Sequence, residues 1–145
     1  MSRASARYEA ALSINTVLKE LGLPLVDEAA EPRFTPPAAV REAARRGLEL
    51  RGITGRGGLD REQARKQGIS SGVARGEQLS AGEEVTLTDL KRMKAFFARH
   101  DGERERNARL ANERSPANIA WLLWGGDAGR EWAQAIIARQ ITATG

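Results

Sequence analysis

The sequence predicts an all-α fold: a small irregular helical domain of about five to seven helices with a separate N-terminal helix. Apolar residues recur at intervals of three and four along most of the chain, which is the spacing of one helix face. Helix-start signals recur as well, with Ser, Thr or Asp directly before such stretches. No segment alternates apolar and polar residues with period two, so we expect no strand.

The composition describes one domain with a thin core. The chain has 145 residues, of which 41% are hydrophobic and 29% charged, and 15 are glycine. It contains no cysteine, which excludes disulfides, thiolate metal sites and cysteine nucleophiles. The N-terminus lacks the apolar stretch of a signal peptide, and no run approaches the roughly 18 apolar residues of a membrane span. We therefore expect a soluble protein without a membrane partner.

The first expected helix covers residues 4–21 and ends at Gly22 and Pro24. The acidic, proline-bounded stretch that follows resembles a linker. The expected organisation is thus an N-terminal helix over residues 1–23, a linker over 24–34 and a helical body over 35–145. The apolar stripe of the first helix suits packing on its own body or on a partner, and we predict partner docking through Ala11, Ile14, Leu18 and Leu21.

The body is expected to begin with a helix from Thr35-Pro36-Pro37 to about Arg51, with Thr35 as the cap. Its face of small residues around Gly47 should let another helix approach closely. Glycines between positions 52 and 58 then break the chain. A polar helix over residues 60–67, capped by Asp60, belongs to a surface insertion over 59–71, and a weaker helix follows over 70–79.

The next helix, over residues 86–100, has the best-specified start. Thr86 and Asp89 have capping-box spacing, and Val85 and Leu90 are placed as a hydrophobic staple. Residues 101–114 are nearly all charged or small, so we expect an exposed connection or a solvated helix there. Ser115-Pro116 begins another helix that ends at Gly125-Gly126. Asp127 is expected to cap the last helix, which buries Trp132, Ile136, Ile137 and Ile141.

Three of the seven aromatic residues are tryptophans that lie within twelve positions of one another. Such residues can stack on bases in single-strand binders, but here isoleucines and leucines surround them. Because large aromatic side chains dominate core energetics, core packing is the favoured interpretation. The expected structural core is Trp121, Trp124, Trp132, Phe97 and Met93.

No motif indicates catalysis. The glycine-rich run from Arg51 to Gly58 lacks the Gly-Lys-Ser/Thr ending of a phosphate loop, so a flexible connection is favoured. His100 is the only histidine and cannot build the usual zinc site without other ligands. A Ser-His-Asp triad would need a nucleophile elbow, which is missing. We expect no catalytic residue, no metal, no cofactor and no enzyme activity.

The charge distribution leaves nucleic-acid binding open. The formal net charge is +4, and arginines gather around positions 41–65 and 91–114. Residues 70–100 are similar to a helix-turn-helix, although six residues connect the two helices where three or four are usual. A small basic DNA-binding or regulatory protein is therefore the alternative function. Its possible phosphate contacts are Arg41, Arg45, Arg56, Lys91, Arg92, Lys94 and Arg99.

Four sequence blocks together resemble a small helical domain that recurs in tailed-phage gene products, alone or beside head-morphogenesis and prohead-protease modules. They are TPPxxVRxxAxxGLxxR from Thr35, GVAR from Gly72, KRMxxFFARH from Lys91 and IAWxxWGGDAGRxxW from Ile119. The resemblance covers roughly residues 35–133. Residues 59–71 and 101–114 depart from the pattern, and the N-terminal helix lies outside it.

The resemblance implies a phage or prophage origin and an association with the virion or its assembly, without catalytic residues. We therefore expect a non-enzymatic phage structural protein that acts through protein–protein contacts, located in the virion or the host cytoplasm. The expected partners are a capsid, portal or scaffold protein, or another copy of the chain.

Overall fold

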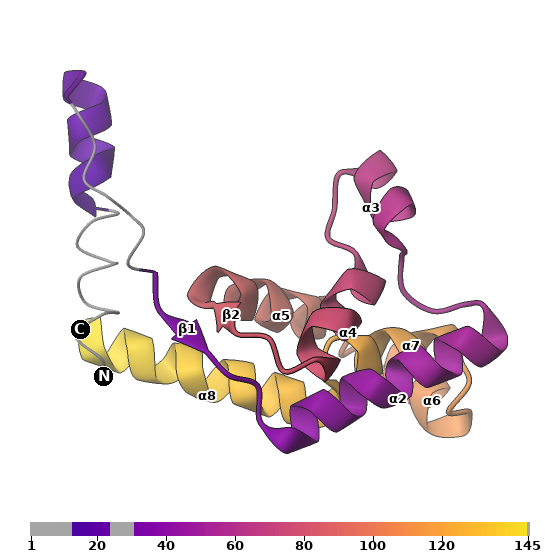
Figure 1. The fold of residues 1–145 in the computed structure, drawn as a ribbon. Helices are drawn as coiled ribbons and strands as arrows, with labels where there is room; N and C mark the ends of the chain where they lie inside the picture. The colour runs from indigo at the N-terminus through magenta and orange to yellow at the C-terminus, as the bar shows by residue number, and fades with distance from the viewer. Residues whose placement is uncertain (1–12, 24–30, 145) are drawn as a thin grey trace.

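The computed structural model describes residues 13–23 and 31–144, and side chains up to residue 140. It is 72% helical with one small sheet, so the all-α prediction is confirmed. A separate helix over residues 13–21, here called the arm helix, stands off the body (Figure 1). The body helices are α2 (Ala38–Thr54), α3 (Arg61–Gln67), α4 (Gly72–Ser80), α5 (Leu87–Arg99), α6 (Glu103–Ala111), α7 (Pro116–Leu123) and α8 (Gly126–Thr144).

The sheet corrects the expectation that the chain has no strand. β1 (Arg33–Phe34) pairs antiparallel with β2 (Val85–Thr86), and two-residue strands are too short to show an alternating pattern. Residues 31–34 are consequently attached to the body and are not part of a linker. The backbone N–H of Thr88 donates to a carboxylate oxygen of Glu31 at 2.8 Å, so the same attachment also reaches the first turn of α5.

The start of α2 differs from the prediction. Pro37, in extended conformation, is the N-cap, the helix begins at Ala38, and no side chain caps it. Thr35 therefore does not cap the helix. Because a proline disfavours helical conformation in the residue before it, Pro37 keeps Pro36 out of the helix, and Pro36 is buried in the body.

Other helix starts follow the sequence. Asp60 with Gln63 and Thr86 with Asp89 both form capping boxes. Ser115 accepts a hydrogen bond from the backbone of Asn118 at the start of α7. α8 is the exception, because it begins at Gly126, two residues earlier than a cap at Asp127 would place it, with left-handed backbone at Gly125 and Gly126. The predicted cap, Asp127, thus lies inside the first turn of α8.

The core forms where α2 crosses α4, α7 and α8, and where α5 packs on α8. The predicted close approach at Gly47 is confirmed: a Cβ at this position would lie 2.8 Å from the backbone nitrogen of Leu123 in α7. Two body helices lie at the surface. α6 buries no residue, and α3 buries only Ala64. Residues 101–114 thus contain a solvated helix.

Candidate functional site

The aromatic corner between α5, α7 and α8 is the centre of the core. The ring of Phe96 stacks on Trp124 with centroids 4.7 Å apart, and Phe97 meets Trp121 edge-on at the same distance. Trp121 and Trp124 are only 3% and 5% exposed. Met93 and Phe97 are buried, while Trp132 is partly buried against the same cluster. The two buried indoles therefore offer no open face for stacking on a base.

Arg109 pins the solvated helix α6 to this corner, a contact that no sequence pattern indicated. Its guanidinium carbon lies 3.6 Å from the ring centroid of Trp121. Its Nη1 donates to the backbone oxygen of His100 at 2.8 Å. Burial of the guanidinium lowers the pKa of Arg109. The indole nitrogen of Trp121 donates a hydrogen bond to a carboxylate oxygen of Asp127 at 2.9 Å. Asp127 thus satisfies the polar atom of a buried ring.

A buried ion pair joins α4 to the start of α5. Nη1 of Arg75 lies 3.0 Å from a carboxylate oxygen of Asp89, and the two side chains are 8% and 17% exposed. Burial alone would raise the pKa of Asp89, but hydrogen bonds from Thr86 and the charge of Arg75 outweigh it and lower this pKa. The ion pair therefore connects the capping box of α5 to α4.

The helices α4 and α5 do not form the compact pair that a helix-turn-helix usually has. Residues 81–86 separate them, and β2 lies in this connection. α4 packs mainly against α2 and α7, whereas α5 packs mainly against α8. Apart from the ion pair of Arg75 and Asp89, the two helices belong to different parts of the core.

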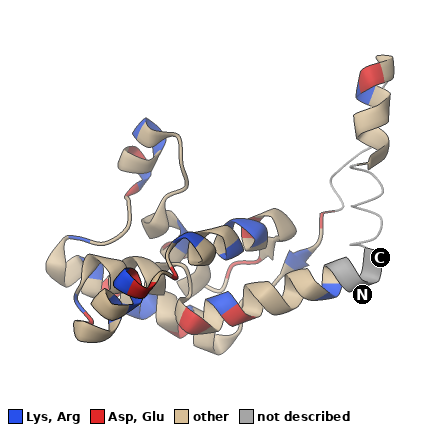
Figure 2. Cartoon of the chain, turned by 180° about the vertical axis from the view of Figure 1, so that it is seen from behind, with Lys and Arg blue, Asp and Glu red and all other residues tan. Residues whose placement is uncertain are grey.

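The basic residues of α5 in the predicted phosphate-binding set are all exposed. Arg92, Lys94 and Arg99 have no ion pair or hydrogen bond from their side chains within residues 13–23 and 31–140, and the same holds for Arg56 in the loop after α2. Lys91 is exposed beside them. Basic and acidic residues nevertheless alternate over the helices of the body and do not form a face of one sign (Figure 2).

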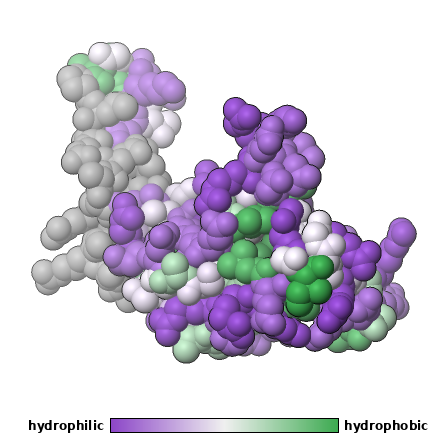
Figure 3. Space-filling model, turned by 45° about the vertical axis from the view of Figure 1, so that its right-hand side comes forward, coloured by the Kyte–Doolittle hydropathy of each residue, from purple (hydrophilic) through white to green (hydrophobic). Residues whose placement is uncertain are grey.

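An apolar groove of about 610 Å³ lies between α5, α7 and both ends of the 59–71 insertion. Its floor includes Phe96 and Trp124, and Leu59 belongs to its lining. Ile69 is 57% exposed in the same lining. Figure 3 shows hydrophobic surface gathered at the base of the protruding segment that carries α3. The insertion thus builds one wall of the groove.

The lining of the groove contains basic side chains and no carboxylate. Arg92 and Arg99 are seven residues apart on one face of α5 and both line the groove, whereas no Asp or Glu does. His100 also lines it, with Nδ1 3.3 Å from a carboxylate oxygen of Glu105. No group of three or more potential metal-ligating side chains occurs in the part of the chain that the structure describes.

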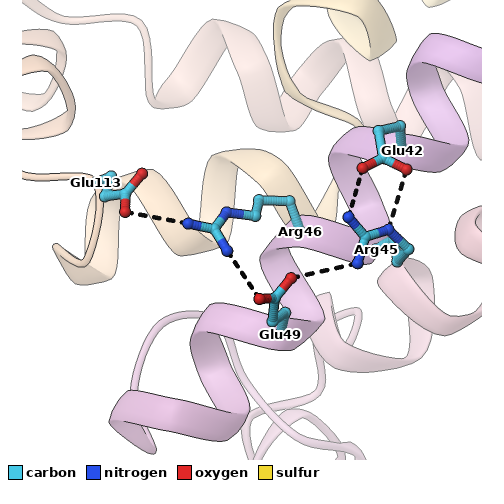
Figure 4. Close-up of polar contacts among 5 residues, drawn as sticks. All are labelled: Glu42, Arg45, Arg46, Glu49 and Glu113. Atoms are coloured by element: carbon cyan, nitrogen blue, oxygen red, sulfur yellow. Dashed lines mark hydrogen bonds and ion pairs between the residues drawn. The ribbon is translucent and has the colours of Figure 1, made fainter.

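The predicted phosphate contacts on α2, Arg41 and Arg45, already donate hydrogen bonds to other residues of the chain. Arg45 donates to both Glu42 and Glu49, and Arg46 lies between Glu49 and Glu113 (Figure 4). The hydrogen bond with Glu42 raises the pKa of Arg45. The remaining member, Arg41, donates to the backbone oxygen of Pro36 at 3.4 Å. The predicted set therefore divides into the paired cations Arg41 and Arg45 on α2 and, among the described residues, the unpaired cations Arg56, Arg92, Lys94 and Arg99.

The arm helix exposes an apolar stripe. Ile14, Val17 and Leu21 are 48%, 52% and 65% exposed, and their spacing of three and four residues places them on one face. Leu18, which the sequence assigned to docking, is half-buried, whereas Val17 belongs to the exposed stripe instead. Ala11 lies outside the described residues.

Comparison of the chain with family models, with curated proteins and with solved structures finds no match. The tailed-phage resemblance therefore rests on the four sequence blocks, which supply the core residues Val40, Met93 and Trp121. Over the residues described, no helix has the length and apolar content needed to cross a membrane.

Proposed function

We propose that the chain is a non-enzymatic structural or assembly protein of a tailed-phage particle, in the virion or the host cytoplasm, and that its arm helix docks on a partner. The exposed stripe of Ile14, Val17 and Leu21 carries this proposal. Contiguous exposed apolar residues on a helix are typical of a face that another protein covers. The partner is a capsid, portal or scaffold protein, or a second copy of the chain.

Incorporation into particles tests the proposal. A variant with Ile14→Gln, Val17→Gln and Leu21→Gln keeps helix-forming residues but removes the apolar face. We expect it to be lost from purified particles of the phage that encodes the chain, as measured by quantitative mass spectrometry. The matched control carries Ile53→Gln and Leu110→Gln, which are 56% and 80% exposed on other helices. Incorporation of the arm variant at the control's level would refute the docking role.

The unpaired cations of α5 favour a second candidate, a small basic DNA-binding or regulatory protein. Arg92, Lys94 and Arg99 are free to contact phosphates, as is Arg56. Phosphate contacts release counterions, so binding to duplex DNA would weaken steeply as salt rises. Reversing the charge of Arg92 and Lys94 should then reduce the salt dependence. No binding of the wild-type chain at low salt would eliminate this candidate.

A further inference from the structure

We infer that the groove between α5, α7 and the 59–71 insertion receives the arm helix of a second copy of this chain, in a head-to-tail contact. This inference rests on the proposed docking role of the arm and names its partner. It follows from two features of one molecule: an exposed apolar face on the arm helix, and an apolar groove of matching chemistry.

The apolar surfaces match in kind. The arm offers three aliphatic side chains on one face, Ile14, Val17 and Leu21, each about half or more exposed. The groove offers, in its lining, the exposed side chain of Ile69 together with small exposed parts of Phe96 and Trp124, which are 6% and 5% exposed. Its volume of about 610 Å³ is within the range of sites that enclose several side-chain-sized groups. A short amphipathic helix in an apolar groove is a common mode of peptide recognition.

The charges are complementary as well. The groove lining contains Arg92 and Arg99 and no carboxylate, and neither guanidinium has a partner among the described residues. Between residues 13 and 28 the sequence has three carboxylates, at Glu20, Asp27 and Glu28, against the single positive charge of Lys19. The arm helix itself is neutral, so the attraction comes from residues 20–28, at and after its end, which carry the three carboxylates and no positive charge. A basic groove favours an approach of this end and thereby a defined direction.

The separation of the two surfaces favours contact between copies. The arm helix lies near the C-terminal end of α8 (Figure 1), whereas the groove is lined by α5, α7 and the residues on either side of α3. Each chain therefore presents one donor and one acceptor on different sides. Such a contact is heterologous, so it repeats from copy to copy until a ring closes or a filament grows. Ring closure strengthens contacts that are individually small.

Mixing two full-length variants tests this directly. The arm variant (Ile14→Gln, Val17→Gln and Leu21→Gln) keeps an intact groove. The groove variant (Arg92→Glu and Arg99→Glu) keeps an intact arm, and both changes are at exposed positions. By light scattering after size exclusion, we expect the wild type to associate as concentration rises. Each variant alone should stay at the monomer mass of 15.8 kDa.

An equimolar mixture of the two variants should give a species of twice the monomer mass that grows no further, because only one functional arm and one functional groove remain. A control with Lys94→Glu and Arg104→Glu reverses two exposed charges outside the groove lining and should associate like the wild type.

Three results would overturn the inference. A wild type that stays monomeric at every concentration would mean that the arm binds a different protein or its own groove. Association of the groove variant alone would mean that arms pair with arms. A mixture that stays monomeric would mean that the two surfaces do not meet. If the arm variant is nevertheless lost from particles, the proposed docking function stands while this inference fails.

Discussion

The arm helix and α7 are both short helices with large apolar side chains, yet only α7 buries them. Ile119, Trp121 and Leu123 of α7 are at most 3% exposed, whereas Ile14 and Leu21 of the arm are about half exposed or more. The neighbours make the difference. Gly47 of α2 and Gly76 of α4 lie so close to α7 that an added Cβ would overlap it. An apolar stripe thus identifies a contact face, while small residues elsewhere decide whether the chain covers it itself.

The largest expected effect on the free energy of unfolding comes from removing a buried ring from the aromatic corner at the end of α7. Trp124→Ala removes a side chain that is 5% exposed and stacks on Phe96. Loss of a buried aromatic side chain leaves a cavity, so the free energy of unfolding should fall by about 3–5 kcal/mol. Urea denaturation followed by circular dichroism measures it. A loss below that of the partly buried Trp132→Ala would contradict the central role of this corner.

Two glycines of α2 sharpen the comparison, because only one of them touches α7. Gly47→Ala forces a Cβ to 2.8 Å from the backbone of Leu123 and should destabilise the protein by about 1–3 kcal/mol. Gly52→Ala has nothing within 4 Å of the new Cβ, so better helix propensity should stabilise it by roughly 0.5–1 kcal/mol. Thermal unfolding compares the two. Equal effects would show that close packing on α7 does not explain Gly47.

The start of α5, which Glu31 and β1 contact, should respond to acid. The pKa of Asp89 is lowered in the folded protein, so its contribution to stability is present above its ordinary pKa and is lost as pH falls below about 3.8. Asp89→Asn should cost about 1–3 kcal/mol near neutral pH, because it removes the buried ion pair with Arg75 as well as a capping interaction. Denaturation at a series of pH values should show that this difference vanishes in acid. A constant difference would contradict the lowered pKa.

The smallest effect is expected at the arm. Ile14→Gln, Val17→Gln and Leu21→Gln change side chains that are already exposed, so the unfolding free energy of dilute protein should move by less than about 0.5 kcal/mol. Urea denaturation at low protein concentration avoids a contribution from association. A loss comparable to that of Gly47→Ala would show that the arm packs on its own body.

Local signals in the sequence predicted most helix starts and much of the core. The capping boxes at Asp60 and Thr86 depend on residues three apart, and the inward row of Met93 and Phe97 follows from helical spacing. Contacts between distant segments could not be predicted in this way. The pairing of β1 with β2 joins residues about fifty positions apart through only two residues on each side.

The candidate site depends still more on distant contacts. The groove brings Leu59 and Ile69 of the insertion next to Phe96 of α5, which no local spacing indicates. The arginines of α2 and α5 look alike in sequence, and Arg45 and Arg92 each have a carboxylate three residues before them. Asp89, the neighbour of Arg92, pairs instead with Arg75 of α4, a distant contact that the sequence does not indicate. Glu42 and Glu49 lie three and four residues from Arg45, so its pairing could have been predicted from this pattern.

The attachment of α6 has a consequence for how the protein opens. This helix buries no residue and is held to the corner by Arg109 above Trp121. A segment with so little buried apolar surface can detach without global unfolding. Its backbone amides should therefore exchange with deuterium well before those of α7, and each opening uncovers one face of an otherwise enclosed indole. The solvent exposure of Trp121 thus reports the detachment of α6 while the rest of the core stays folded.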